Sequence, residues 1–256
     1  MLKLFICLFA VIALCEEVSA QNSMGFASYE SDILSARPVR FIFGIGAGSY
    51  LYSHGGSFSP SCNCNFGDES GFRAMVLGEF RIQYPKLGFA YGVSVTHHDA
   101  DATFTREEMR PSVIVGDPAD IEVQYRNTSN VLLQWIAVTP EFFWFLPRSD
   151  LFFQVGMEFG FPLEARYDHV ESILSEGIVY YDGSTEHVLL EEQDIPGGSE
   201  LRLALSGSVG YDFWLAPSLA LTPRVGISVP LSSVSSEDDD WRVLTGYAIL
   251  MLNLRI

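Results

Sequence analysis

The chain has 256 residues, 48% of them hydrophobic, and carries 32 acidic against 15 basic residues, for a net charge of −17. This acidity argues against nucleic-acid binding, because phosphate backbones need basic patches, and against polybasic attachment to a lipid surface. The apolar residues fall in runs too short for a transmembrane helix, which needs roughly 20.

Residues 1–20 have the pattern of a secretory signal peptide. Lys3 precedes the unbroken apolar run 4–14, and small residues end the segment at Ala20, where signal peptidase would cut. Lipidation at Cys15 is the alternative, which the bulky residue before it disfavours. We therefore expect export across the inner membrane.

Alternation with a period of two, the strand period, begins after a short leader expected at 21–37. In 219–229 one face carries Leu, Pro, Val and Ile, and the other carries Ala, Thr, Arg, Gly and Ser. The same pattern predicts eight strands, near 39–52, 72–83, 87–99, 131–145, 151–166, 201–213, 219–229 and 242–256.

The connections between these strands alternate in length. Tight turns are expected at 84–86, 146–150 and 216–218, and longer polar stretches near 53–70, 100–130, 167–200 and 232–241. Short periplasmic turns and long external loops are typical of membrane barrels. The sequence thus predicts an all-β, transmembrane, antiparallel up-and-down β-barrel of about eight strands, forming one domain at 38–256.

Two of the long stretches contain further strand-like runs, at 121–125 and at 177–181 with 187–190. We expect them to extend the barrel strands or to form hairpins above the membrane. If one hairpin is inserted instead, the barrel has ten strands and a wider lumen.

Aromatic residues cluster beside the short turns, where an interfacial girdle belongs. The residues assigned to this girdle are Tyr84, Phe143, Trp144, Phe153, Phe213 and Trp214. A soluble β-protein is the alternative, but its solvent-facing strand positions would carry charges throughout, and most charges here lie in the loops.

The glycine-alternating strand 43–48 and the last strand 246–256, together with the signal peptide, resemble those of small outer-membrane β-barrel families. These are the OmpA/OmpX-type barrel domain and the PorT-like barrels. The resemblance covers 38–256 and is architectural, with no diagnostic catalytic motif. It implies a location in the bacterial outer membrane.

Charged residues on the strand faces opposite the apolar ones predict a charge network in the lumen. Its expected members are Arg40, Arg73, Glu79, Arg81, Glu141, Glu158, Glu164, Arg166, Arg202, Asp212 and Arg224. An eight-stranded barrel is just wide enough for its side chains to fill, so we expect a salt-bridged plug. A narrow channel for ions or small solutes is the alternative.

The expected loops are strongly acidic, with Asp99, Asp101, Glu107, Glu108, several acids in 168–200, and the run 237–240. Because no calcium-loop spacing is present, a solvated surface is the simpler interpretation. Loose bridging to lipopolysaccharide by divalent cations is the alternative.

Two short motifs carry weaker chemical hypotheses. The segment 97–101, with His97 and His98 followed by two aspartates, lies at the outer end of a strand, where a hydrolase or acyltransferase would place a general base. Neighbouring strand residues face opposite sides, so the two histidines cannot share one site. Cys62 and Cys64 are an incomplete metal-ligand set and would form only a strained disulfide.

The sequence therefore predicts a non-enzymatic outer-membrane barrel, without cofactor or bound metal, acting in envelope integrity, surface interaction or assistance to envelope machinery. Its expected partners are outer-membrane lipid, lipopolysaccharide and the barrel-assembly machinery, with no nucleic acid.

Overall fold

The computed structural model describes residues 39–56, 69–113, 120–237 and 241–256. The signal peptide at 1–20, the leader at 21–37, and Cys62 and Cys64 lie outside these residues and stay predictions. Among the described residues, no helix is long and apolar enough to cross a membrane.

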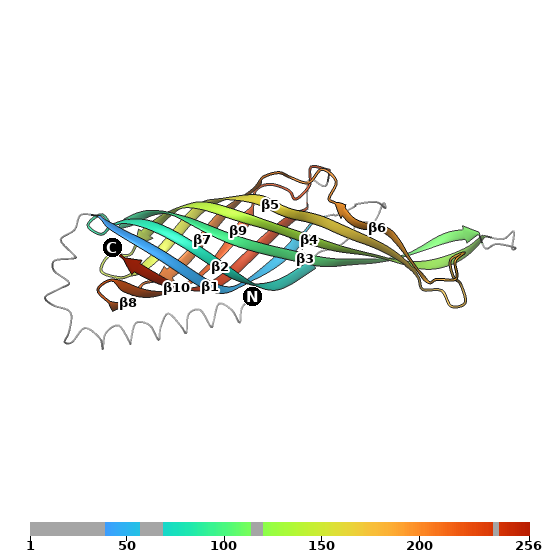
Figure 1. The fold of residues 1–256 in the computed structure, drawn as a ribbon, viewed down its shortest axis with the longest axis horizontal. Helices are drawn as coiled ribbons and strands as arrows, with labels where there is room; N and C mark the ends of the chain where they lie inside the picture. The colour runs from blue at the N-terminus through green and yellow to red at the C-terminus, as the bar shows by residue number, and fades with distance from the viewer. Residues whose placement is uncertain (1–38, 57–68, 114–119, 238–240) are drawn as a thin grey trace. The chain divides into compact units, whose positions relative to one another are not determined.

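Ten antiparallel strands form one sheet (Figure 1). Their bounds are β1 Arg40–Gly55, β2 Glu69–Tyr84, β3 Phe89–Val113, β4 Asp120–Phe145, β5 Leu151–Ile173, β6 Glu186–Asp194, β7 Arg202–Tyr211, β8 Phe213–Ala216, β9 Leu219–Pro230 and β10 Arg242–Arg255.

Pairing of β10 with both β1 and β9 closes the sheet into a barrel. The ring runs β10-β1-β2-β3-β4-β5-β7-β9 and back to β10, so it contains eight strands. The short β8 continues β7 after a break at Asp212, and β6 pairs only with β5, outside the ring. The eight-strand prediction is confirmed, and the ten-strand alternative is not adopted.

Of the strand-like runs predicted in the long connections, two belong to strands and one does not. Residues 121–125 extend β4, and 187–190 belong to β6. Residues 177–181 do not form a strand, although their composition predicted one. There the chain turns, with Gly183 N–H donating to the Tyr180 carbonyl and Ser184 accepting from Tyr180 N–H.

The outer face of the barrel is apolar and the inner face is buried. In β10, Leu250, Leu252 and Leu254 are about half exposed, whereas Met251 between them is buried. In β9, Thr222 and Arg224 are buried on the inside, as the alternation predicted. An outward apolar band on a closed antiparallel barrel is the arrangement that lipid requires, so we treat the barrel as membrane-spanning.

The two ends of the barrel differ in their connections. At the turn end, as we call it, 85–88 joins β2 to β3 and 146–150 joins β4 to β5, both through short hydrogen-bonded turns. Gly88 has a φ of 70°, which glycine adopts without strain. The opposite loop end carries the long connections. Barrel precedent places the turn end in the periplasm.

The lumen is filled throughout the described barrel, but with different chemistry in its two halves. The turn-end half holds buried charges beside a small aromatic cluster of Phe143, Phe145 and Phe152. The loop-end half holds an apolar core that includes Leu133 and Trp135. The sequence predicted a polar lumen in both halves, so the apolar core of the loop-end half was not expected. It forms because β4 carries apolar residues on its inner face as well as on its outer face.

Strands β3, β4 and β5 continue far beyond the barrel at the loop end (Figure 1). β3 and β4 have 25 and 26 residues, against 12 in β9. A membrane crossing takes about 10 strand residues, so β3 has a surplus of roughly 15, or about 50 Å of extended chain. We name the residues 105–113, 120–128, 168–173 and all of β6 the projecting sheet.

Closure of the barrel requires a close approach of β1 to β10 at Gly48. A Cβ on Gly48 would overlap the carbonyl oxygen of Ala248 and the backbone of Ile249, whereas a Cβ on Gly78 would meet nothing within 4 Å. We expect Gly48→Ala to destabilise the barrel by about 1–3 kcal/mol through overpacking, and Gly78→Ala to be neutral.

Denaturant titration, followed by the mobility difference between unboiled and boiled protein in detergent gels, measures this effect. Equal midpoints for the two variants would contradict the close-approach argument.

Candidate functional site

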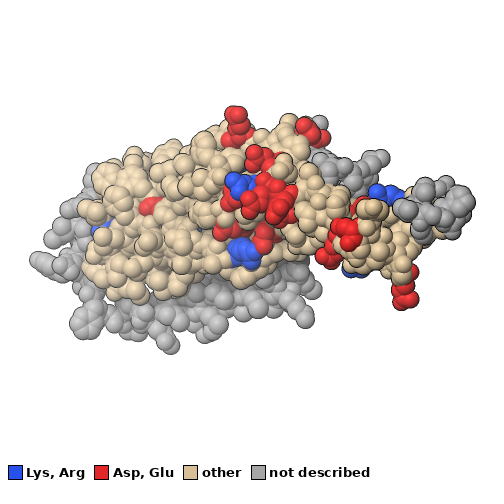
Figure 2. All heavy atoms as spheres, turned by 45° about the vertical axis from the view of Figure 1, so that its right-hand side comes forward, with Lys and Arg blue, Asp and Glu red and all other residues tan. Residues whose placement is uncertain are grey.

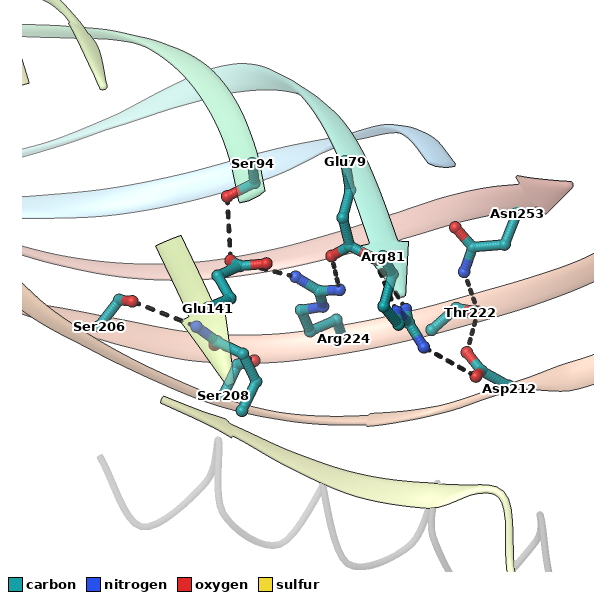
Figure 3. Close-up of polar contacts among 11 residues, drawn as sticks. Glu79, Arg81, Ser94, Glu141, Ser206, Ser208, Asp212, Thr222, Arg224 and Asn253 are labelled. Atoms are coloured by element: carbon teal, nitrogen blue, oxygen red, sulfur yellow. Dashed lines mark hydrogen bonds and ion pairs between the residues drawn. The ribbon is translucent and has the colours of Figure 1, made fainter. Parts of the chain in front are cut away.

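The most concentrated chemistry in the barrel is a buried ion network in the turn-end half of the lumen (Figure 3). Alternation along β2 turns Glu79 and Arg81 inward, and β9 and β4 contribute Arg224 and Glu141 in the same way. Asp212 joins them from the break between β7 and β8. The side chains of all five residues are almost completely buried.

Glu79 is the centre of this network. Its Oε1 accepts from Arg81 Nε at 3.0 Å and from Arg81 Nη2 at 2.8 Å, and its Oε2 accepts from Arg224 Nη2. One carboxylate therefore neutralises parts of two guanidinium groups. Charge-assisted bonds of this kind are the strong ones in a protein interior.

Two further carboxylates complete the network (Figure 3). Asp212 accepts from Arg81 Nη1 at 3.0 Å and from the Thr222 hydroxyl at 2.6 Å. Glu141 accepts from Ser94 at 2.9 Å and lies 3.8 Å from Arg224 Nη1. The chain of contacts thus crosses the lumen from β3 to the β7–β8 break.

Aromatic rings cover the guanidinium groups. The Phe143 ring centroid lies 4.5 Å from Arg81 Cζ and 5.4 Å from Arg224 Cζ, and Phe152 lies at 5.0 and 5.6 Å. Cation–π contacts of this kind are strongest where water is excluded. Phe143 was predicted in the membrane-facing girdle, and that prediction is wrong, because its β4 position has the same inward parity as Glu141.

A second buried pair, Glu158 and Arg202, lies nearer the loop end. Glu158 also accepts from the Ser228 hydroxyl at 2.7 Å, and Arg202 stacks over the Trp135 ring with its Cζ 4.7 Å from the centroid. On the other side, His98 stacks on Trp135 at 4.9 Å. Charged and aromatic groups together leave this level of the lumen filled.

The remaining predicted lumen residues lie elsewhere. Arg40 is half-buried at the turn end, and Arg73 is half-exposed at the loop end, where it pairs with Asp101. Glu164 and Arg166 were expected inside, and that prediction is wrong.

The reason is a β-bulge. The β4–β5 register shifts between Gln134 and Trp135, so Leu163 is an extra residue in β5. Beyond it Tyr167 faces the inside, while Glu164 and Arg166 face outward and pair with each other at 3.5 Å. A single inserted residue changes the face of the sheet to which every later side chain of the strand points.

Of the other girdle residues, Tyr84, Trp144, Phe153 and Phe213 lie on the outside, close to the turn end. Trp214 was also predicted there, and that prediction is wrong, because Trp214 pairs with Ala220, which is buried on the inner side of β9. Trp144 and Phe153 are exposed and neighbour each other, with ring centroids 6.4 Å apart. Tyr84 contacts Phe89, and Phe213 contacts Tyr211. Trp214 donates to Asp150 at 3.3 Å.

A seam opens between β2 and β3 towards the loop end, because their pairing stops at Leu77 and Thr96. Two tyrosines of β1 bridge it: the Tyr50 hydroxyl bonds the backbone of Asp99, and the Tyr52 hydroxyl bonds Asp101 through its carbonyl at 2.8 Å and its carboxylate at 2.6 Å. These tyrosines were not among the predicted site residues. Their inward parity in β1 was the available signal.

The two histidines of the His97–Asp101 segment lie on opposite sides of β3. His97 lies on the outside with Asp99 at 3.8 Å, whereas His98 is buried and shares a hydrogen bond with Thr96 at 2.9 Å. Asp101 is engaged by Tyr52 and Arg73. Within the described residues, no group of three or more histidine, cysteine or acidic side chains is arranged to hold a metal.

On the face that Figure 2 shows, most acidic side chains gather towards the loop end and on the projecting sheet. The exposed ones on the projecting sheet are Glu107, Glu122, Glu186, Glu191, Glu192 and Asp194. The charge of some of them is neutralised by a neighbouring arginine: Glu107, for example, accepts a hydrogen bond from Arg126 at 2.7 Å. The sheet has an inner side of its own, where Val123, Tyr125 and Ile173 pack together, so it presents an ordered acidic surface.

No protein-family model matches the chain, and no curated protein matches its sequence. Among solved structures, Neisserial surface protein A is similar over 84% of this chain and 97% of its own, at 12% identity and a TM-score of 0.37. Ail, the attachment invasion locus protein of Yersinia pestis, aligns over 84% and 98% at 10% identity and a TM-score of 0.29. The translocator domain of the autotransporter NalP from Neisseria meningitidis aligns over 88% and 92% at 8% identity and a TM-score of 0.28. These neighbours are small outer-membrane β-barrel proteins.

The ion network predicts a strong dependence of stability on Glu79. Glu79→Gln leaves two buried guanidinium groups without their shared carboxylate, and we expect it to cost about 3–5 kcal/mol. Glu164→Gln, on the outer face, is the matched control and should change stability by no more than about 0.5 kcal/mol. Denaturant midpoints of the detergent-folded barrel measure both. Similar midpoints would mean that the network contributes little.

His169 predicts an acid-sensitive projecting sheet. Its side chain is buried beside Asn127, with Nε2 and Oδ1 3.1 Å apart, and burial lowers the pKa of His169 below its ordinary value. His169 therefore binds a proton more tightly when the projecting sheet is open than when it is folded. The contribution of neutral His169 to the stability of the sheet is complete above about pH 6.5 and decreases as the pH falls below that value.

We therefore expect hydrogen-exchange protection factors of amides in 168–173 to fall between about pH 7.5 and about pH 5. His169→Gln should remove most of that fall, and the same substitution at exposed His187 should retain it. An unchanged pH dependence in the His169 variant would contradict the assignment.

Proposed function

We propose that the chain is a non-conducting, non-enzymatic outer-membrane barrel that displays its projecting sheet for interaction at the cell surface. The observation that carries the proposal is the continuous pairing of β3 with β4, from Phe89 and Trp144 at the turn end to Val113 and Asp120. An ordered sheet extending about 50 Å beyond the membrane crossing is far more than anchoring requires.

The filled lumen supports a displaying role over transport. The buried ion network occupies the turn-end half, and the loop-end half holds an apolar core that includes Trp241, which donates to His54 Nδ1 at 3.3 Å. Charges in a narrow lumen that pair with each other leave no hydrated path. A narrow channel for ions or small solutes is the alternative function, and a surface hydrolase using His98 is a more distant one.

The acidity of the projecting sheet suggests the chemistry of the partner. Exposed carboxylates on both β4 and β6 favour cationic surfaces, through steering that weakens with salt. Bridging by divalent cations to lipopolysaccharide remains part of the same proposal, as does a contribution to envelope integrity.

The projecting hairpin can be removed without touching the membrane crossing. Thr103 pairs with Asn130, and its hydroxyl donates to the Asn130 side chain at 2.9 Å. Deleting 104–129 and joining these two residues through Asn-Gly, which favours a two-residue hairpin turn, gives a trimmed barrel. Its heat-modifiable mobility verifies folding.

Cells with equal amounts of full-length or trimmed barrel are then compared for adherence to an immobilised basic protein such as lysozyme. We expect the trimmed barrel to lose part of the adherence, because β6 keeps its four exposed carboxylates, and added salt to weaken the adherence of the full-length barrel. Equal adherence would contradict the display role. Planar-bilayer recording is the companion experiment, in which large stable channels would favour the channel alternative.

A further inference from the structure

A cavity of about 490 Å³ lies at the turn end of the barrel. It is lined by Arg40 of β1, Gln83 of β2 and the two turns at 85–88 and 146–150. Trp144 also borders it. None of the functions considered above uses this cavity.

The cavity is positively charged in an otherwise acidic chain. Arg40, Lys86 and Arg148 line it, against one carboxylate, that of Asp150. Among the described residues, these three cations form no ion pair within 4 Å, whereas Arg81, Arg202 and Arg224 of the lumen all do. A site with surplus positive charge favours an anionic ligand.

Two buried polar atoms at the cavity lack hydrogen-bond partners in the described structure. They are Arg40 Nε and Gln83 Oε1, and the Gln83 side chain is only 7% exposed. Buried polar groups are nearly always bonded to protein, water or ligand. Since the amide of glutamine can present either its oxygen or its nitrogen, Gln83 suits a ligand that carries both acceptors and donors.

The backbone at Arg148 adds an independent observation. Arg148 has a φ of 63°, a left-handed conformation that is uncommon outside glycine. Gly88 occupies the comparable region in the neighbouring turn. A long cationic side chain is thus held at the cavity in a turn position where glycine would be less strained, and such outliers concentrate at ligand sites.

The position of the cavity identifies the source of the anion. Trp144 is 57% exposed on the outer face, at the level where girdle aromatics meet lipid headgroups, and Leu87 is 67% exposed beside it. Cationic and apolar groups therefore border the same cavity, which fits an amphiphile better than a free ion. We propose that this cavity binds the phosphate group of a phospholipid from the leaflet at the turn end, held by Arg40, Lys86 and Arg148.

In this arrangement the cations contact the phosphate oxygens through charge-assisted hydrogen bonds. The acyl chains lie outside the barrel, along Trp144 and Leu87. Gln83 and Asp150 face the polar end of the headgroup. The site is at the opposite end from the projecting sheet, so it does not depend on the surface role.

The test uses the full-length barrel, folded in an uncharged detergent. Short-chain phosphatidylglycerol, below its micelle-forming concentration, is titrated while the amide resonance of Gly88 and the heat of binding are recorded. We expect saturable binding that shifts Gly88, because that residue lines the cavity.

The double variant Lys86→Gln with Arg148→Gln should bind at least roughly tenfold more weakly, and Arg40→Gln should also weaken binding. Arg242→Gln, an exposed arginine at the loop end, is the matched control and should bind as the unaltered chain does. Each variant is first shown to be heat-modifiable.

Inorganic phosphate, titrated in the same way, separates the two sources of the anion. Weaker binding of inorganic phosphate than of phosphatidylglycerol supports the headgroup. Equally tight binding would overturn the lipid assignment in favour of a free-anion site. Absence of a Gly88 shift, or equal binding by the double variant and the Arg242 control, would overturn the site itself.

Discussion

Backbone hydrogen bonding in lipid is the constraint on which the rest of this structure depends. A membrane-spanning sheet must leave no open edge, because the hydrocarbon region contains no water to bond its N–H and C=O groups. Pairing of β10 with β1 removes the edge, and Gly48 permits it by letting the two strands approach. With eight strands, closure also fixes a narrow lumen, and that lumen has to be filled.

The chain fills the lumen in two different ways. In the turn-end half, three carboxylates and two guanidinium groups neutralise each other under a cover of phenylalanine rings. In the loop-end half, aromatic and aliphatic side chains form an apolar core. Both solutions fill the lumen, the first with paired charges and the second through packing, and both support the proposed display role over transport.

The two ends of the barrel are chemically opposite. Carboxylates are concentrated on the projecting sheet, while Arg40, Lys86 and Arg148 gather at the turn end. Beyond Leu77 and Thr96, where β2 and β3 stop pairing with each other, two tyrosines and an Arg73–Asp101 ion pair bond β3 instead. The long strands thus project without opening the barrel, which links the fold to the proposed display role.

The strand count, the tight turns and the face of most side chains could be predicted from the residues alone, because alternation with a period of two is a local property of the chain. The alternation also identified Glu79, Arg81, Glu141, Asp212 and Arg224 as inward charges, and parity counted from Glu141 would have placed Phe143 inside as well. Which of these charges contact each other depends on how the strands pair in space. The bulge at Leu163, which turned Glu164 and Arg166 outward, depends on pairing with β4, and the tyrosine bridges depend on where the pairing of β2 with β3 ends. Register and strand partnership are long-range properties, so no local pattern along the chain contains them.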